Sequence, residues 1–252
     1  MPRDRGIENI ERYFGNFTKL VADKIKKKGK VKILDAGCGY GVAMMDFLKR
    51  FSDKVEMIGY NYSENDGNEK IMKQQAIKKK IFTKKGIEDI KKFPKILYID
   101  ASKELPFKDN EFDFIYSMAS VYLYDDKIRF LEECNRVLKK DGIARISVAL
   151  YPHFEKKKGF PSKYYEMWEI WDKGKEVKIW NYCKKIKGLK VVGKKKESKQ
   201  YLEIRKQPKL DFKLQFVSSI DYNFIWKEWG GVKSIYTTQK KFKPRWKIKN
   251  QK

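Results

Sequence analysis

The fold is decided by the stretch Val31-Lys32-Ile33-Leu34-Asp35-Ala36-Gly37-Cys38-Gly39-Tyr40-Gly41. Its first four residues are mostly apolar and β-branched, which predicts a short strand over residues 31–34. Three glycines follow in alternate positions, and residues 42–51 have the apolar spacing of a helix. Residues 55–60 predict a second strand. The order strand, glycine loop, helix, strand is that of a βαβ unit.

The alternation of helices and strands continues on both sides of this unit. Apolar residues at spacings of three and four predict helices over residues 7–28 and about 125–139, and Asp125 and Asp126 suit the N-terminus of the second helix. Further strands are expected over residues 96–99, 112–116 and 143–150. An α/β fold with a doubly wound, mostly parallel sheet is therefore predicted.

The composition changes after Tyr151. All six tryptophans lie at Trp168 or beyond, and residues 164–187 contain aromatic and apolar residues at helical spacing. Residues 189–192 and 201–204 predict a C-terminal antiparallel hairpin, which is followed by an aromatic, basic tail. We expect one domain over residues 1–208 and a C-terminal extension over residues 209–252.

The 252-residue chain carries 59 Lys and Arg residues against 33 Asp and Glu residues, a formal net charge of +26. Cationic surfaces attract nucleic acids by releasing condensed counterions. Only nine of the 59 basic residues are arginine, however, and phosphate recognition favours the two-pronged arginine side chain. RNA is therefore retained as an alternative partner, and the charge alone does not define a function.

Targeting and metal signals are absent from the sequence. No run of about 18 apolar residues predicts a transmembrane helix, and the first residues lack the apolar stretch of a signal peptide. The cysteines Cys38, Cys134 and Cys183 form no CxxC pair, so no metal site is expected. A cytoplasmic location without a membrane partner is expected. The sequence predicts no oligomeric state.

The glycine loop favours a nucleotide-like cofactor, because backbone without side chains lets such a ligand approach the first strand–helix turn. A dinucleotide fingerprint, G-x-G-x-x-G, would need a glycine at position 42, where Val42 stands. The third glycine is instead Gly41. A glycine turn that binds no cofactor is the structural alternative at this point.

Two later stretches of the sequence indicate which cofactor the glycine loop binds. The first stretch is Asp100-Ala101-Ser102-Lys103-Glu104-Leu105-Pro106-Phe107, with Phe112-Asp113 beyond it. The second consists of Glu132, Arg136-Val137-Leu138 and Gly142. With the glycine loop they resemble the class I S-adenosylmethionine-dependent methyltransferases, specifically the type 11-like group that contains quinone-biosynthesis C-methyltransferases. The resemblance covers residues 31–150 and extends loosely to about 208. It implies a Rossmann-like fold and S-adenosylmethionine as the cofactor.

The resemblance also implies a set of cofactor-binding residues. They are Asp35, Gly37, Cys38, Gly39, Gly41, Asn61, Asp100, Ala101 and Ser117. The first strand and its loop would line the methionine and ribose, Asp100 would accept a hydrogen bond from the adenine amino group, and Ser117 with Met118 would lie beside the sulfonium. The family usually has an acidic residue where Asn61 stands. An amide lacks the two acceptor oxygens of a carboxylate, so Glu64 is a candidate substitute, and a non-catalytic cofactor-binding protein stays open.

The acceptor is expected over the carboxyl ends of the strands. An activated methyl group can be transferred by positioning alone, so no acid–base residue is obligatory; Tyr151 and His153 are the candidates. No Asn/Asp-Pro-Pro-Tyr segment or rim cysteine points to a nucleobase. The aromatic residues after 151 could cover an apolar acceptor, stack unpaired bases, or simply pack. A small-molecule acceptor is expected first, RNA second.

Overall fold

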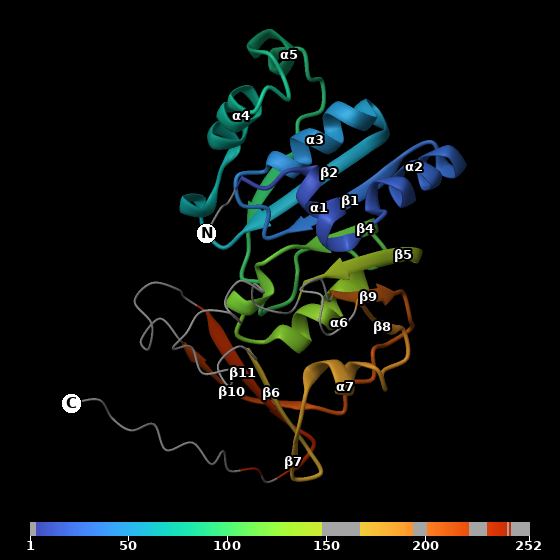
Figure 1. The fold of residues 1–252 in the computed structure, drawn as a ribbon, viewed down its shortest axis with the longest axis vertical. Coiled ribbons are helices and arrows are strands. Elements are labelled where there is room, and N and C mark those ends of the chain that lie inside the picture. The colour runs from blue at the N-terminus through green and yellow to red at the C-terminus, as the bar shows by residue number, and fades with distance from the viewer. Residues whose placement is uncertain (1–3, 148–166, 194–200, 222–230, 241, 243–252) are drawn as a thin grey trace, which may run out of the picture.

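The computed structural model describes residues 4–147, 167–193, 201–221, 231–240 and 242. Its main sheet has seven strands in the order β3-β2-β1-β4-β5-β9-β8 (Figure 1). The five parallel strands are β1 (Val31–Ala36), β2 (Val55–Asn61), β3 (Lys95–Tyr98), β4 (Phe112–Ser117) and β5 (Leu138–Ile146). The mostly parallel sheet is confirmed, and its strand order reverses between β1 and β4, where ligands bind in such sheets.

The predicted C-terminal hairpin is also confirmed. Strand β9 (Tyr201–Arg205) runs antiparallel to β5, and β8 (Leu189–Val192) runs antiparallel to β9 at the edge of the sheet.

Helices cover both faces of this sheet. They are α1 (Ile7–Phe14), α2 (Phe17–Lys28), α3 (Val42–Phe51), α4 (Glu69–Lys78), α5 (Lys84–Glu88), α6 (Lys127–Val137) and α7 (Ile179–Cys183). Alternate residues of one strand enter opposite cores: Ile33 packs with α1–α4, whereas Leu34 packs with α6. This burial on both faces explains the continuous apolar runs that predicted the strands.

One predicted helix is wrong in its continuity. Residues 7–28 form two helices because Gly15 takes a left-handed backbone with φ of +69° and ends α1. The Phe17 amide then donates to the Gly15 carbonyl, and α2 begins. Among the residues that the structure describes, none of the helices has the length and apolar character needed to span a membrane.

A second, four-stranded sheet lies beyond α6 at the lower end of the molecule (Figure 1). Its order is β10 (Gln215–Asp221), β11 (Val232–Thr237), β6 (Trp168–Asp172) and β7 (Lys175–Val177). Strand β6 pairs in parallel with β11, so this sheet joins chain from before β8 with chain from after β9. The helical stripe predicted over residues 164–187 is therefore wrong for β6 and β7, and within the described residues 167–187 the α-helix α7 is what remains of it.

The reason for this error is a tight turn. Lys173 and Gly174 both have positive φ, +50° and +79°, and connect β6 to its antiparallel partner β7. Two consecutive left-handed residues are the geometry of a two-residue hairpin, which no helix can contain.

Lys127, the first residue of α6, attaches the second sheet to this helix. The buried Lys127 ammonium donates to the Val232 carbonyl at 2.6 Å and to the Ser234 hydroxyl at 2.6 Å. The Lys127 amide donates to the Tyr236 hydroxyl, which in turn donates to Asp126. Asp126 also caps α6 by accepting from the Arg129 amide, as predicted. The start of β11 is thereby held beside the segment that leads into α6.

Candidate functional site

The glycine loop is anchored between β1 and β2. The amides of Gly37 and Cys38 both donate to the Tyr60 carbonyl at 3.0 Å. Gly37 has φ of +81°, and a Cβ at this residue would lie 2.4 Å from the Cβ of Ser120. Only glycine satisfies both the backbone conformation and this close approach to the loop that follows β4.

A cavity of about 730 Å³ opens at the carboxyl ends of the parallel strands. That volume is in the range of small-molecule and cofactor sites. Seven of the nine residues predicted to bind the cofactor line it, namely Asp35, Gly37, Cys38, Gly39, Asn61, Asp100 and Ala101. The fold thus brings together residues that follow β1, β2 and β3.

The other predicted residues lie elsewhere. Gly41 directly precedes α3, with φ of +70°, and packs against Met72. Ser117 is fully buried, and its hydroxyl lies 2.6 Å from that of Ser120. Neither is among the lining residues, although Met118 and Ser120 are. Tyr151 and His153 lie outside the described residues.

Asp35 is a buried carboxylate at the inner end of the cavity. Burial raises the pKa of Asp35 to about 7, although a 2.7 Å hydrogen bond from the Tyr116 hydroxyl opposes the shift. Such a carboxylate is poised to accept hydrogen bonds from an ammonium group, which would restore its charge.

Unlike the Asp35 carboxylate, the Asn61 side-chain amide is hydrogen-bonded to the backbone around it. Its Oδ1 accepts from the Gly39 amide at 2.8 Å, and its Nδ2 donates to the carbonyls of Gly39 and Gly67 at 2.9 and 3.0 Å. The Cys38 thiol also donates to Oδ1, at 3.5 Å. Burial is the main cause that raises the pKa of this thiol.

Asp100 turns the chain at the end of β3. Its Oδ1 accepts from the Ser102 amide at 3.0 Å, and its Oδ2 lies 3.4 Å from the ammonium of Lys103. The turn places Asp100 and Ala101 at the cavity, which Asn61 and the exposed Tyr62 also line.

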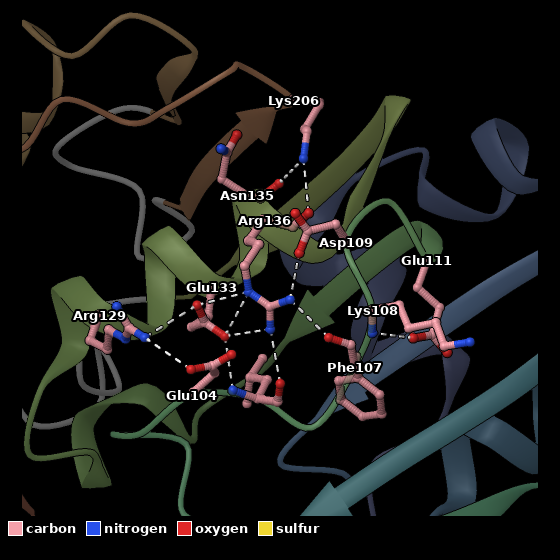
Figure 2. Close-up of polar contacts among 11 residues, drawn as sticks. Glu104, Phe107, Lys108, Asp109, Glu111, Arg129, Glu133, Asn135, Arg136 and Lys206 are labelled. Carbon is pink, nitrogen blue, oxygen red and sulfur yellow. Dashed lines mark hydrogen bonds and ion pairs between the residues drawn. The ribbon is translucent and has the colours of Figure 1, made fainter.

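The two motif stretches meet beside this turn. The Arg136 guanidinium donates to the carbonyls of Leu105 and Phe107 and pairs with Glu133, whose carboxylate also accepts from the Leu105 amide (Figure 2). The motif glutamate is therefore Glu133, three residues before Arg136, and not Glu132 as the sequence comparison had it. The clamp fixes the chain between β3 and β4, and with it the loop that carries Asp100.

Sequence reasoning missed the outer wall of the cavity. Three residues of the second sheet and the residue directly before β11 line it, and the Ser219 hydroxyl donates to the Asp125 carboxylate at 2.8 Å. Those four are Ser219, Asp221, Gly231 and Val232. No local pattern could have revealed them, because they reach the cavity through the long-range pairing of β10, β11 and β6 and through the contacts of β11 with Lys127.

The cavity is acidic although the chain is strongly basic. Its described lining includes the carboxylates Asp35, Asp66, Asp100, Asp125 and Asp221. Among the same described residues, Arg5 is the one basic side chain. The excess of lysine is thus placed away from the described part of this site.

The central region of the chain is similar to known methyltransferases. Residues 34–146 match the family model described as a methyltransferase domain. The glycine/sarcosine/dimethylglycine N-methyltransferase of Actinopolyspora halophila is 28% identical over 122 residues, which are 48% of this chain and 19% of that protein. The demethylmenaquinone methyltransferase of Staphylococcus carnosus (strain TM300) is 32% identical over 119 residues, 47% of this chain and 42% of that protein.

A solved structure of a SAM-dependent methyltransferase from Aquifex aeolicus superposes with a TM-score of 0.45 at 20% identity, over 72% of this chain and 86% of that one. The chain spans less than half the length of either curated relative. The matched segment contains the glycine loop, the carboxylate after β3 and the Glu133–Arg136 clamp. Residues 34–146, somewhat less than half of the chain, are therefore similar to the methyltransferase domain family, and this similarity indicates S-adenosylmethionine as the cofactor.

Proposed function

We propose that the protein transfers a methyl group from S-adenosylmethionine to a small-molecule acceptor. The observation that carries this proposal is one cavity, lined on its inner side by the glycine loop and on its outer side by the second sheet. Such a cavity can hold a cofactor and an acceptor side by side and exclude water from both, which suits in-line transfer of an activated methyl group.

The residues present fit the cofactor by their chemistry. Its ammonium group matches the buried carboxylate of Asp35, its adenine amino group matches the Asp100 carboxylate, and the loop from Gly37 to Gly39 allows close approach of the methionine. When bound, the cofactor supplies a methyl group on a positively charged sulfur. The chain's own residues would bind, orient and desolvate the two reactants.

The acceptor end supports a neutral or cationic small molecule. Asp125, Asp221 and Ser219 line it together with Tyr122 and Tyr124. Carboxylates there repel phosphate, which weighs against a nucleotide or RNA acceptor. The relatives are named for amine and quinone acceptors, which are small molecules.

A labelling screen tests this proposal. The purified chain is incubated with methyl-labelled S-adenosylmethionine and a cell extract, and the label is followed into small organic molecules, RNA and protein. We expect label in the small-molecule fraction. Label in RNA or protein would contradict the proposed acceptor class, and label in no fraction with the cofactor bound would contradict the proposed enzymatic activity.

A further inference from the structure

Four hydroxyl groups form a hydrogen-bond network between β2 and the loop that follows β4. The Oγ atoms of Ser117 and Ser120 lie 2.6 Å apart, and the Tyr124 hydroxyl oxygen lies 3.2 Å from the Ser120 Oγ. The hydroxyl oxygens of Tyr60 and Tyr124 are also 3.2 Å apart. Tyr60, Ser120 and Tyr124 all line the cavity, so a ligand there would meet this hydroxyl network.

The Ala36 carbonyl fixes the direction of every hydrogen bond in the network. Its oxygen can only accept, and it lies 2.9 Å from the Ser120 Oγ, so the Ser120 proton is used there. Because a hydroxyl group has one proton, Ser117 and Tyr124 must both donate to Ser120. Since the Tyr124 proton is thereby used, Tyr60 must donate to Tyr124. The oxygens of the two tyrosines can therefore offer a ligand only lone pairs.

The Tyr124 hydroxyl lies between the inner and the outer wall of the cavity. A Cβ at Gly37 would be 3.5 Å from the Tyr124 hydroxyl oxygen, so this oxygen is beside the glycine loop. The next residue, Asp125, accepts from Ser219 of the outer wall. The Tyr124 ring packs edge-on against Phe130, with ring centroids 4.9 Å apart. Under the proposed function, this is where a methyl acceptor would meet the cofactor.

Two other hydroxyl groups of the lining are also used as donors. Tyr116 donates to Asp35, and Ser219 donates to Asp125. Burial is the main cause that raises the pKa of Tyr124, so its phenol stays protonated at neutral pH and does not act as a base. These hydroxyl groups therefore offer a reacting atom neither a donor nor a base.

This arrangement selects among methyl acceptors by their chemistry. An enolate or a phenolate would bring a negative charge to oxygens that can only accept hydrogen bonds. An alcohol would need a base to take its proton. An uncharged amine needs neither, because its N–H group donates to an oxygen while its lone pair stays available to react.

We propose that the methyl acceptor is a primary or secondary amine whose N–H group donates to the Tyr124 oxygen. This inference rests on the proposed function, because it presupposes methyl transfer at this cavity. The amine lone pair forms a bond to the methyl carbon, and the carbon–sulfur bond breaks with its electron pair going to sulfur. The products are S-adenosylhomocysteine and a methylated ammonium ion, which loses its proton to water after release. The positive charge that develops on nitrogen strengthens the hydrogen bond to Tyr124.

The position of the transferred methyl group tests the proposal on the wild-type chain. The protein is incubated with a cell extract and with S-adenosylmethionine labelled with carbon-13 in its methyl group, and the small-molecule products are analysed by proton–carbon correlation NMR. We expect the labelled methyl group on nitrogen. A methyl group on carbon or oxygen of a small molecule would overturn this inference and leave the proposed function standing. No labelled small molecule, although S-adenosylhomocysteine binds, would instead overturn the proposed function.

Tyr124→Phe tests the role of the oxygen, since it keeps the ring that packs on Phe130. The rate of transfer to the same extract should fall by about tenfold or more, while S-adenosylhomocysteine affinity by calorimetry stays unchanged. Tyr182→Phe is the matched control, because Tyr182 is buried but is not among the described residues that line the cavity, and it should change neither quantity. A wild-type transfer rate in Tyr124→Phe would overturn the inference.

Discussion

Asp35 is the residue whose environment makes the clearest prediction about binding. Because burial raises the pKa of Asp35 to about 7, the free protein holds this carboxyl protonated at lower pH. The ammonium group of the cofactor needs the ionised form. Affinity for S-adenosylhomocysteine should therefore rise with pH up to about 7 and then level off, by about tenfold per unit below that pKa.

Calorimetry between about pH 5.5 and pH 8.5 measures this dependence. Asp35→Asn should bind more weakly at high pH and lose the dependence, whereas the exposed Asp53→Asn should behave as the wild type. An affinity that falls as pH rises through about 7 would contradict the role of Asp35.

The close packing of Gly37 leads to a second prediction for a single residue. Gly37→Ala forces the Cβ against Ser120 and should weaken binding of S-adenosylhomocysteine by more than about a hundredfold, since the loop must shift. Gly29→Ala is the matched control: its φ is also positive, +79°, but a Cβ there meets nothing within 4 Å. It should lower stability by about 1 kcal/mol and leave binding intact. The double variant Gly37→Ala/Ser120→Gly should recover part of the binding in the same titration. Equal losses of binding in Gly37→Ala and Gly29→Ala would contradict the packing argument.

Among the elements, the βαβ unit could be predicted from sequence because its signals are local. Helix α3 has the bounds that apolar spacing gave it, and β1 and β2 each extend the predicted strand by only one or two residues. The second sheet could not be predicted. Its strands β6 and β11 are about 60 residues apart, and their pairing depends on tertiary contacts that leave no periodic pattern.

The candidate site likewise contains residues that local sequence patterns reveal and residues that only tertiary contacts bring to it. Residues of the glycine loop and of the turn at Asp100 carry motifs and could be found, but Asp66 and Ser219 carry none. Asn61 could be located by its position, while its bonds to Gly39 and Gly67 depend on how the chain folds back after β2.

The attachment of the second sheet can be tested at Lys127. Burial lowers the pKa of this lysine to about 7, and its Nζ is bonded to Tyr124, Val232 and Ser234. Lys127→Ala removes these three hydrogen bonds and should lower the free energy of unfolding by about 2 to 3 kcal/mol. We expect methyl transfer to fall further than S-adenosylhomocysteine affinity, because only the outer wall of the cavity depends on this contact.

For Lys127→Ala, denaturant unfolding measures stability, calorimetry measures S-adenosylhomocysteine affinity, and incorporation of labelled methyl groups measures transfer, with the exposed Lys209→Ala as control. Unchanged stability and unchanged transfer in Lys127→Ala would show that the second sheet is held by other contacts.

The whole molecule combines a net charge of +26 with an acidic cavity. Its basic surface should bind RNA weakly and in a strongly salt-dependent way, without reaching the site. Residues 240–252 contain seven basic residues and no acidic ones. Removing them should lower the number of counterions released on RNA binding by several, which flattens the dependence of RNA affinity on salt concentration. Filter binding at increasing salt measures this, and RNA should not displace S-adenosylhomocysteine. Displacement, or tight binding that ignores salt, would favour an RNA acceptor.

The measurement that tests the account most directly is calorimetric titration of the purified chain with S-adenosylhomocysteine and, separately, with NAD. The cavity between the glycine loop and Asp100 should bind S-adenosylhomocysteine at one site per chain and should not bind NAD, because Val42 stands where the dinucleotide loop needs its third glycine. Gly39→Val should remove the binding. Binding of NAD with no response to S-adenosylhomocysteine would contradict the account.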